Sequence, residues 1–260
     1  MRDHGHELPQ RSPWLCGWFT RYAAYYLRRH VHAIRLSRAA RIPELGERSA
    51  IFFANHAAWF DPLIALFAAD RLYPGRPLYA PFDAAALARY PVLGRFGFFG
   101  VEQNSRRGAA QFLRAANAIL DQSRNTIWLT PQGRFADVRE RPVEFKAGLA
   151  HLAASRNDVV LIPAAAEYVF WEERTPEVLL RFGIPLHSSS ARSADDWNEN
   201  LQSALAATQD ALAAEVISRD PLAFTNLLRG AAGVGGFYET WRRLRSKLRG
   251  QRFSPEHSQL

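Results

Sequence analysis

Short apolar runs alternate with stretches in which apolar residues recur every three or four positions, and the two patterns predict strands and helices in turn. The apolar runs predict strands at Ser49–Ala54, Pro77–Ala80, Phe98–Glu102, Thr126–Thr130, Val159–Pro163, Ala165–Phe170 and Val178–Phe182. The helical spacing predicts helices at Pro62–Asp70, Ala84–Tyr90, Arg106–Gln122, Phe145–Ser155 and Ala194–Ile217. Strands that alternate with helices are typical of an α/β fold. We therefore expect a single domain with a mainly parallel central sheet flanked by helices, whose last two strands pair as a hairpin.

Both ends of the chain are predicted to form amphipathic helices that carry aromatic and basic residues. The N-terminal stretch interleaves apolar rings with arginines: Trp14, Leu15, Trp18, Phe19, Tyr22, Tyr25 and Tyr26 with Arg21, Arg28 and Arg29. The C-terminal stripe follows a glycine-rich hinge at Gly230–Gly236 and consists of Phe237, Trp241, Leu244 and Leu248. Such a helix either packs its stripe on the protein body or lies at a membrane interface, and the repetition at both ends favours the membrane. We expect three parts: an interfacial helical segment over 1–48, an α/β domain over 49–229, and the hinge with a basic helix over 230–260.

Composition narrows the class of protein. The 260 residues are 48% apolar and 22% charged, which is the balance of a folded globular chain. The single cysteine, Cys16, argues against a disulfide framework or a cysteine zinc cluster and indicates a reducing compartment. The apolar stretch over 13–27 is too short to span a bilayer, is interrupted by Arg21 and lacks the cleavage site of a secretory signal. The sequence thus predicts a peripheral protein on the cytoplasmic face of the cell membrane.

The net charge of +8 is concentrated at the two ends. Residues 1–48 hold nine arginines against four acidic residues, and residues 237–260 hold six lysines and arginines against two acidic residues. The part of the chain between them is therefore nearly neutral. A net positive charge makes nucleic acid and anionic membrane lipid the candidate partners. Since no zinc-finger spacing or RNA-recognition signature accompanies the charge, we expect membrane lipids as partners and no nucleic acid.

Candidate chemistry follows the first buried strand directly, in the segment Asn55-His56-Ala57-Ala58-Trp59-Phe60-Asp61-Pro62. Histidine is the side chain best suited to take a proton near neutral pH. A carboxylate on one ring nitrogen fixes the tautomer and leaves the other nitrogen free. A turn between His56 and Asp61 would let these two side chains meet. Asp61 also precedes Pro62, as a helix N-cap does, and both roles are open to it.

Further segments with distinctive composition follow in order along the chain. They are Gly100-Val101-Glu102-Gln103-Asn104-Ser105-Arg106-Arg107-Gly108, Thr130-Pro131-Gln132-Gly133-Arg134-Phe135, Phe145-Lys146-Ala147-Gly148 and Leu161-Ile162-Pro163-Ala164. Together with the Asn-His-x4-Asp segment, they resemble the blocks of the glycerolipid acyltransferase family, which includes the 1-acylglycerol-3-phosphate acyltransferases. Those blocks usually read Val-Asp-Arg, Pro-Glu-Gly-Thr-Arg, Phe-Lys-x-Gly and a hydrophobic strand that ends in Ile-Pro-Val. The resemblance covers about residues 50–165 and extends loosely to the N-terminal segment, which in this family sits on the membrane.

The resemblance implies an O-acyltransferase. It would move a fatty acyl group from an acyl thioester, on coenzyme A or acyl carrier protein, to the hydroxyl of a lysophospholipid or another membrane lipid. His56 would take the proton from the acceptor hydroxyl, and Asp61 would orient its ring. Substrate contacts are expected from the remaining block residues, which are Asn55, Glu102, Gln103, Arg106, Gln132, Gly133, Arg134 and Lys146. The turn over 131–133 would offer backbone N–H groups to an anion or to the developing oxyanion.

No cofactor and no metal ion are expected beside the acyl donor. The reaction needs no acyl-enzyme, and the sequence has no Gly-x-Ser-x-Gly motif to form one. The pairs His4/His6 and His30/His32 have a spacing that suits a metal, but no carboxylate or cysteine lies near either pair to complete a site.

The sequence departs from the family at three positions. Gln103 and Phe135 stand where the family has arginines associated with the phosphate of the acceptor, and Gln132 stands where it has glutamate. Replacing arginine by glutamine removes a fixed charge and a bidentate donor. Either other arginines compensate, with Arg106, Arg134, Arg139 and Arg141 as candidates, or the acceptor lacks a glycerol phosphate. The alternative function is a catalytically weak lipid-binding or scaffold protein that keeps the acyltransferase fold.

Overall fold

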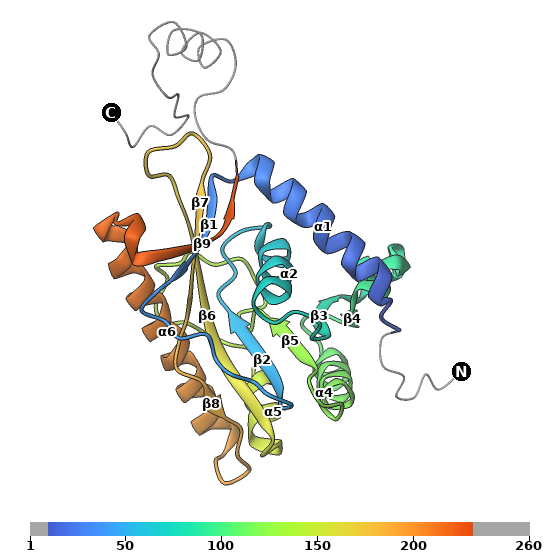
Figure 1. The fold of residues 1–260 in the computed structure, drawn as a ribbon. Coiled ribbons are helices and arrows are strands. Elements are labelled where there is room, and N and C mark those ends of the chain that lie inside the picture. Colours follow the sequence, from blue (N-terminus) through green and yellow to red (C-terminus); the bar gives the residue numbers. More distant parts are fainter. Residues whose placement is uncertain (1–9, 231–260) are drawn as a thin grey trace, which may run out of the picture.

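The computed structural model describes residues 10–230, which form a mixed sheet covered by helices on both faces (Figure 1). Along the chain the elements are α1 (Pro13–His30), β1 (Ala33–Ser37), β2 (Ser49–Ala54), α2 (Asp61–Leu72), β3 (Leu78–Asp83), α3 (Ala84–Arg89), η1 (Pro91–Phe96), β4 (Phe98–Val101), α4 (Arg106–Leu120), β5 (Thr126–Leu129), α5 (Gly148–Ser155), β6 (Val159–Val169), β7 (Glu177–Phe182), β8 (Leu186–His187), α6 (Ala194–Ser218), η2 (Pro221–Ala223) and β9 (Phe224–Arg229). The strand order within the described residues is β4-β3-β5-β2-β6-β7-β1-β9, and β8 pairs with β6.

The sheet is mainly parallel, as the sequence predicts. In its centre β2 pairs in parallel with both β5 and β6, and β3 pairs in parallel with β4 and β5. The predicted hairpin is confirmed, because β6 and β7 pair antiparallel. Strand β9 also runs antiparallel to its neighbour, β1.

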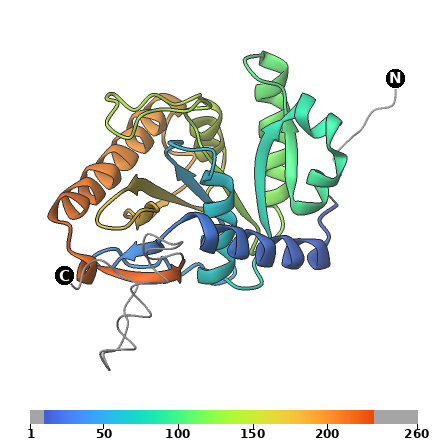
Figure 2. The same cartoon turned by 90° about the horizontal axis from the view of Figure 1, so that it is seen from above.

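Two apolar layers lie on opposite faces of this sheet, and strand β2 contributes to both. Phe52 packs in the layer beneath α1 and α2, while Ile51 and Phe53 pack in the layer beneath α4, α5 and α6. Seen from above, α1 and α6 lie on opposite sides of the sheet (Figure 2). A strand that is apolar at successive positions needs cover on both faces, and this accounts for the three-layered arrangement.

The boundaries of the N-terminal segment require a correction. The helix that we expected within 1–48 ends at His30, and Ala33–Ser37 forms a fully buried strand of the central sheet. Arg35 in the middle of this strand breaks the apolar run and hides it from the sequence pattern. In the fold Arg35 is compensated by a buried ion pair with Glu177 on β7. Residues 31–48 therefore belong largely to the α/β domain.

Two further predictions need adjustment. The strands expected at Val159–Pro163 and Ala165–Phe170 are one continuous strand, β6, which pairs with β2 over its first half and with β7 over its second half. The helix expected at Phe145–Ser155 begins only at Gly148. The predicted C-terminal helix lies outside the described residues. Of the predicted hinge at Gly230–Gly236, only Gly230 is described.

Helix α1 carries two different faces. Its inner face is made of small or buried residues, among them Cys16, Ala23 and Leu27. The outer face exposes a row of aromatic rings: Trp14, Trp18, Tyr22 and Tyr25. Neither α1 nor any other helix within residues 10–230 has the length and apolar character needed to cross a bilayer.

Candidate active site

The predicted site residues gather at the edge of the sheet where the central parallel strands end. His56 follows β2, the segment from Glu102 follows β4, and the turn over 131–133 follows β5. The carboxyl ends of parallel strands are the usual place for a binding site in an α/β fold. Strand β6 continues past this edge and forms a wall beside the loop that holds His56.

His56 and Asp61 are in direct contact. The Nδ1 atom of His56 lies 2.7 Å from Oδ2 of Asp61, and both side chains are largely buried. A carboxylate only accepts, so Nδ1 carries the proton and the lone pair of His56 lies on Nε2. Among the described residues no protein group hydrogen-bonds to Nε2, which is the arrangement a general base requires.

Asp61 is held by the loop that precedes α2, and it does not cap the helix. It is the first residue of α2, whose N-cap is Phe60, and its carboxylate accepts the backbone N–H of Ala58 at 3.0 Å. The N-cap role that we considered for Asp61 is therefore wrong, and its role as partner of His56 is the one the fold uses.

Tyr168 on β6 is a third member of this group, and the sequence analysis missed it. Its hydroxyl donates to Oδ1 of Asp61 at 2.5 Å, so the two carboxylate oxygens serve two different side chains. Burial raises the pKa of Tyr168 well above its ordinary value, and the charge of Asp61 and the hydrogen bond to it raise it further. The phenol therefore stays a donor at any pH at which an enzyme works.

The Asn55 side chain forms hydrogen bonds with the backbone of β6. Its side-chain Nδ2 donates to the Ala166 carbonyl at 3.0 Å, and its Oδ1 accepts the Ala166 N–H at 2.9 Å. The residue is only 2% exposed. This pairing ties the start of the His56 loop to the neighbouring strand. The substrate contact that we expected of Asn55 stays a prediction.

The turn after β5 is stabilised by Lys146. Gly133 has a φ of 65°, and a Cβ atom there would lie 2.5 Å from Cε of Lys146. The Lys146 ammonium lies across this glycine and donates to Oδ1 of Asn104 at 3.1 Å. The expected residues Gly133 and Lys146 are thus brought together, and Lys146 links the segment after β4 to the turn after β5.

The Gly133 N–H of this turn is occupied by a hydrogen bond, whereas the Gln132 side chain has a free acceptor. The N–H of Gly133 donates to the Thr130 carbonyl at 3.0 Å, so it is not free to meet an oxyanion as we expected. Pro131 has no N–H, which leaves that of Gln132 as the candidate donor in the turn. The Gln132 side chain is 8% exposed, and its Oε1 has no hydrogen-bond partner. A buried acceptor without a partner is costly, which suits a residue that meets a ligand.

Three of the four arginines that we considered as replacements are already paired. Arg134 forms an ion pair with Glu140, Arg139 with Asp137, and Arg141 with Asp210 on α6. These pairs are exposed, and in each of them an acidic side chain already occupies the guanidinium that a phosphate would contact.

The segment after β4 remains open to solvent. Glu102, Gln103 and Arg106 are exposed, and Glu102 lies 4.0 Å from Arg107 in a loose ion pair. The structure places these residues at the same edge of the sheet as His56, but no hydrogen bond or ion pair joins them to His56 or Asp61. Their expected contact with substrate stays a prediction.

Phe135 lies against the ring of His56. The two ring centroids are 4.2 Å apart at an interplanar angle of 33°, and the Ala136 N–H donates to the His56 carbonyl at 2.9 Å. The Phe135 side chain is still 57% exposed. An aromatic surface thus stands beside the candidate base, at the position where the resemblance led us to expect an arginine.

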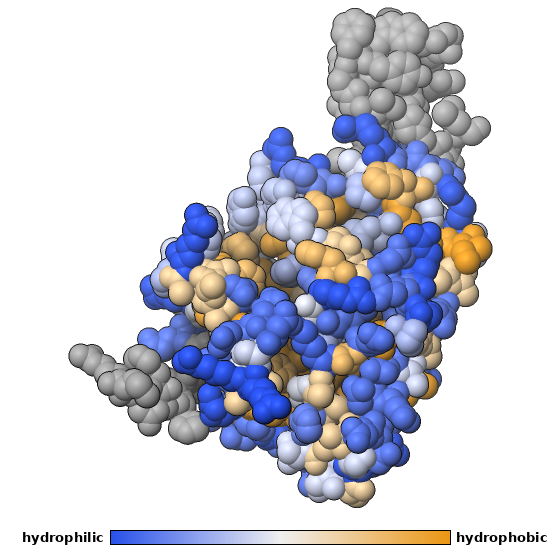
Figure 3. Space-filling view, turned by 180° about the vertical axis from the view of Figure 1, so that it is seen from behind, coloured by the Kyte–Doolittle hydropathy of each residue, from blue (hydrophilic) through white to orange (hydrophobic). Residues whose placement is uncertain are grey.

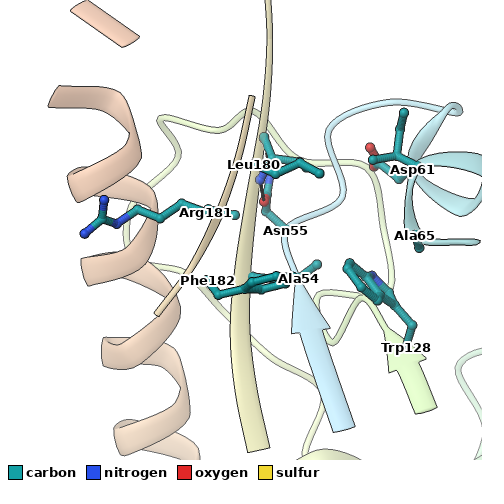
Figure 4. Close-up of a pocket in the computed structure, with 12 residues that line it drawn as sticks. Ala54, Asn55, Asp61, Ala65, Trp128, Leu180, Arg181 and Phe182 are labelled. Carbon is teal, nitrogen blue, oxygen red and sulfur yellow. Dashed lines mark hydrogen bonds between the residues drawn. The ribbon is translucent and has the colours of Figure 1, made fainter. Parts of the chain in front are cut away.

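A small cavity of about 20 Å³ lies behind Asp61, between α2 and the sheet. Figure 4 shows Trp128 and Phe182 on its lower side and Asn55 and Asp61 above it. Arg181, which also lines it, points away to α6, where it pairs with Glu215. The cavity is far smaller than an acyl chain. Within residues 10–230 no group of three or more histidine, cysteine or acidic side chains is placed to hold a metal ion.

Comparison with known proteins agrees with this class of site. The model of the Acyltransferase family matches residues 28–167, more than half of the chain, and the chain belongs to this family. Among solved structures, the crystal structure of the 1-acyl-sn-glycerophosphate acyltransferase PlsC from Thermotoga maritima is similar, with a TM-score of 0.53 and 15% sequence identity. That similarity covers 77% of this chain and 79% of PlsC, and it confirms the fold class. A search of curated proteins gave no match.

Proposed function

We propose that this protein transfers a fatty acyl group from an acyl thioester to the hydroxyl of a lysophospholipid or another membrane lipid. The observation that carries the proposal is the contact of His56 with Asp61, which leaves Nε2 of the ring free at the open edge of the sheet. Membership of the Acyltransferase family supports the same class of reaction.

His56 acts as the general base in this proposal. Its Nε2 takes the proton of the acceptor hydroxyl as the oxygen attacks the thioester carbonyl, and the ionised Asp61 stabilises the imidazolium that results. When the carbon–sulfur bond breaks, the thiolate of coenzyme A or acyl carrier protein leaves and receives the proton. Gln132, with its unpartnered Oε1, lies in the neighbouring turn, and Lys146 packs against Gly133 of the same turn, so both side chains are placed to contact substrate.

The acceptor is the part of the proposal in which this chain differs from its family. The ring of Phe135 borders His56, and the arginines in the same loop are each paired with an acidic residue. A doubly charged phosphate next to the reacting hydroxyl would find no free guanidinium among these groups. We therefore propose that the preferred acceptor has no phosphate close to its hydroxyl, and that lysophosphatidic acid is not the best substrate.

The outer face of α1 supports a position on a membrane surface. Trp14 and Trp18 are 75% and 54% exposed, and Tyr22 and Tyr25 continue the same row. Aromatic rings next to arginine suit the headgroup region of a bilayer. The view from behind, away from α1, is mostly hydrophilic, with apolar residues in small groups (Figure 3).

The aromatic face continues toward the site. Tyr26 on α1 meets Trp59 and Phe60 with ring centroids 6.5 and 6.3 Å apart, and Phe60 meets Tyr168 at 6.5 Å. Trp59 and Phe60 belong to the loop that holds His56. An acceptor lipid lying in a membrane under α1 would therefore lie close to the base, and this supports a peripheral enzyme that works on membrane lipids.

The experiment supplies the purified protein with acyl-CoA and acyl-ACP in turn, together with a panel of lysolipids that includes lysophosphatidic acid. Mass spectrometry identifies the acylated products. We expect acylation of at least one lysolipid, with lysophosphatidic acid not the preferred one. A preference for lysophosphatidic acid would contradict the proposed acceptor class, and no acylation of any lysolipid from either donor would contradict the enzyme.

One observation favours the alternative, a lipid-binding protein with weak or no activity. The three departures from the family, at Gln103, Gln132 and Phe135, all lie on the segments that border the site. Under this alternative the protein binds lysolipid vesicles while the acyl thioester stays intact. Consumption of the thioester together with formation of an acylated lipid would exclude it.

A further inference from the structure

Asp61 shares its carboxylate between two side chains from different elements. His56 from the loop after β2 contacts Oδ2, and Tyr168 from β6 donates to Oδ1. The Ala58 N–H is a second donor to Oδ2. Both carboxylate oxygens therefore accept hydrogen bonds, and the Tyr168 bond is the shortest of the three.

We propose that Tyr168 is a positioning residue of the reaction: it holds the Asp61 carboxylate against His56 and weakens the attraction of that carboxylate for a proton on the His56 ring. This inference rests on the proposed role of His56 as base. A hydroxyl that donates to a carboxylate draws negative charge toward itself. The carboxylate then attracts a proton on His56 less strongly. A larger fraction of the protein molecules therefore has the neutral imidazole, which can accept a proton from substrate.

The surroundings leave Asp61 as the group through which Tyr168 acts. Tyr168 faces α2 and the His56 loop, where the ring of Phe60 lies 6.5 Å away and Asp61 is the charged neighbour. From α1, Tyr26 meets Phe60 and not Asp61. From β7, Arg181 is turned to the opposite face and pairs with Glu215. Phe135, on the other side of His56, carries no charge.

The test compares the unchanged protein with Tyr168→Phe by NMR titration of the histidine ring protons. The signal of His56 is assigned as the one missing from His56→Gln. We expect the midpoint of the His56 titration to move up by about one pH unit in Tyr168→Phe, a tenfold change in the protonation equilibrium. A midpoint that stays in place or moves down would overturn the proposal, and this readout needs no catalytic turnover.

Two controls separate this effect from a loss of structure. Tyr73→Phe removes another partly buried hydroxyl, which donates to the Pro43 carbonyl at 3.1 Å far from the site, and it should leave the midpoint unchanged. In an Asp61→Asn background, Tyr168→Phe should cause no further shift, because the carboxylate that links the two rings is gone. A shift of the same size in that background would show that Tyr168 does not act through Asp61.

The pH profile of acyl transfer gives the second readout. The acid limb of kcat/KM reports the free enzyme, so Tyr168→Phe should move it upward by the same amount and restore near-normal rates at high pH. A rate lowered equally at all pH values would indicate a purely structural role. If His56→Ala retains full activity, the proposed role of His56 as base fails. If His56→Ala is inactive but the midpoint of the His56 titration is the same in Tyr168→Phe as in the unchanged protein, only the present inference is overturned.

Discussion

His56 lies between two chemically different neighbours. On one side the Asp61 carboxylate contacts Nδ1, and on the other side the Phe135 ring lies against the imidazole. The carboxylate fixes the orientation of the imidazole ring, while the Phe135 ring carries no charge that could hold a phosphate. In the proposed reaction, base chemistry and acceptor choice would depend on these adjacent side chains, and a substitution at Phe135 would separate the two.

Phe135→Arg should restore a preference for a phosphate-bearing acceptor. A guanidinium at this position would add charge-assisted hydrogen bonds beside the reacting hydroxyl. We expect the ratio of kcat/KM for lysophosphatidic acid to that for an acceptor without a nearby phosphate to rise about tenfold. Ile184→Arg adds the same charge at another exposed apolar position, beyond the end of β7, and should leave this ratio unchanged. An equal ratio in all three proteins would contradict the role given to Phe135.

The part of the site that the sequence predicts is the part formed by near neighbours in the chain. His56 and Asp61 are five positions apart, and one turn brings them together. The bond from Tyr168 to Asp61 spans 107 positions and that from Asn55 to Ala166 spans 111. Such contacts depend on β6 continuing past the end of β2, which the apolar pattern, interrupted at Pro163, did not indicate.

At the scale of elements, apolar content decided which strands could be predicted. Strand β2 lies in the sheet centre, is apolar at nearly every position and was predicted with its boundaries. Strand β1 contains Arg35, and the edge strand β9 is half polar, so neither was predicted. A buried ion pair or an edge position allows polar residues into a strand, and only the tertiary structure reveals either condition.

The first turn of α4 shows how closely elements approach one another beside the site. A Cβ atom on Gly108 would lie 1.7 Å from the backbone oxygen of Glu102. Gly108→Ala must therefore push α4 away from the end of β4, and we expect it to lower the free energy of unfolding by about 1–3 kcal/mol. Urea unfolding measures the change. Gly94→Ala is the matched control, since a Cβ there meets nothing within 4 Å. Equal stability of the two variants would contradict the packing described.

At the scale of the whole molecule, the open edge of the sheet and the outer face of α1 are joined by aromatic rings. Contacts run from Tyr26 through Trp59 and Phe60 to Tyr168. The sequence indicated an interfacial helix at the N-terminus, and the fold adds that its exposed rings point away from the body. Membrane binding and access of the acceptor to His56 would then depend on the same side of the protein.

Removal of the two exposed tryptophans should weaken membrane binding. Trp14→Ala with Trp18→Ala removes the largest rings of the outer face of α1, and we expect binding to anionic vesicles to fall by about tenfold or more. Vesicle sedimentation measures the loss of binding, and its comparison at low and high salt measures the electrostatic contribution of the arginines. Ile217→Ala changes a similarly exposed apolar residue near the end of α6 and should bind normally. Unchanged binding of the double variant would place the membrane contact elsewhere.

The central claim is that His56 is the base of an acyl-transfer reaction, and one comparison tests it most directly. Acyl transfer from the thioester to the accepted lysolipid is measured for His56→Ala and for His151→Ala, an exposed histidine on α5. General-base catalysis contributes about 10²–10⁴-fold, so His56→Ala should lose activity by that factor while its melting temperature stays close to that of the unchanged protein. His151→Ala should retain full activity. Acyl transfer by a folded His56→Ala at the rate of the unchanged protein would contradict the account.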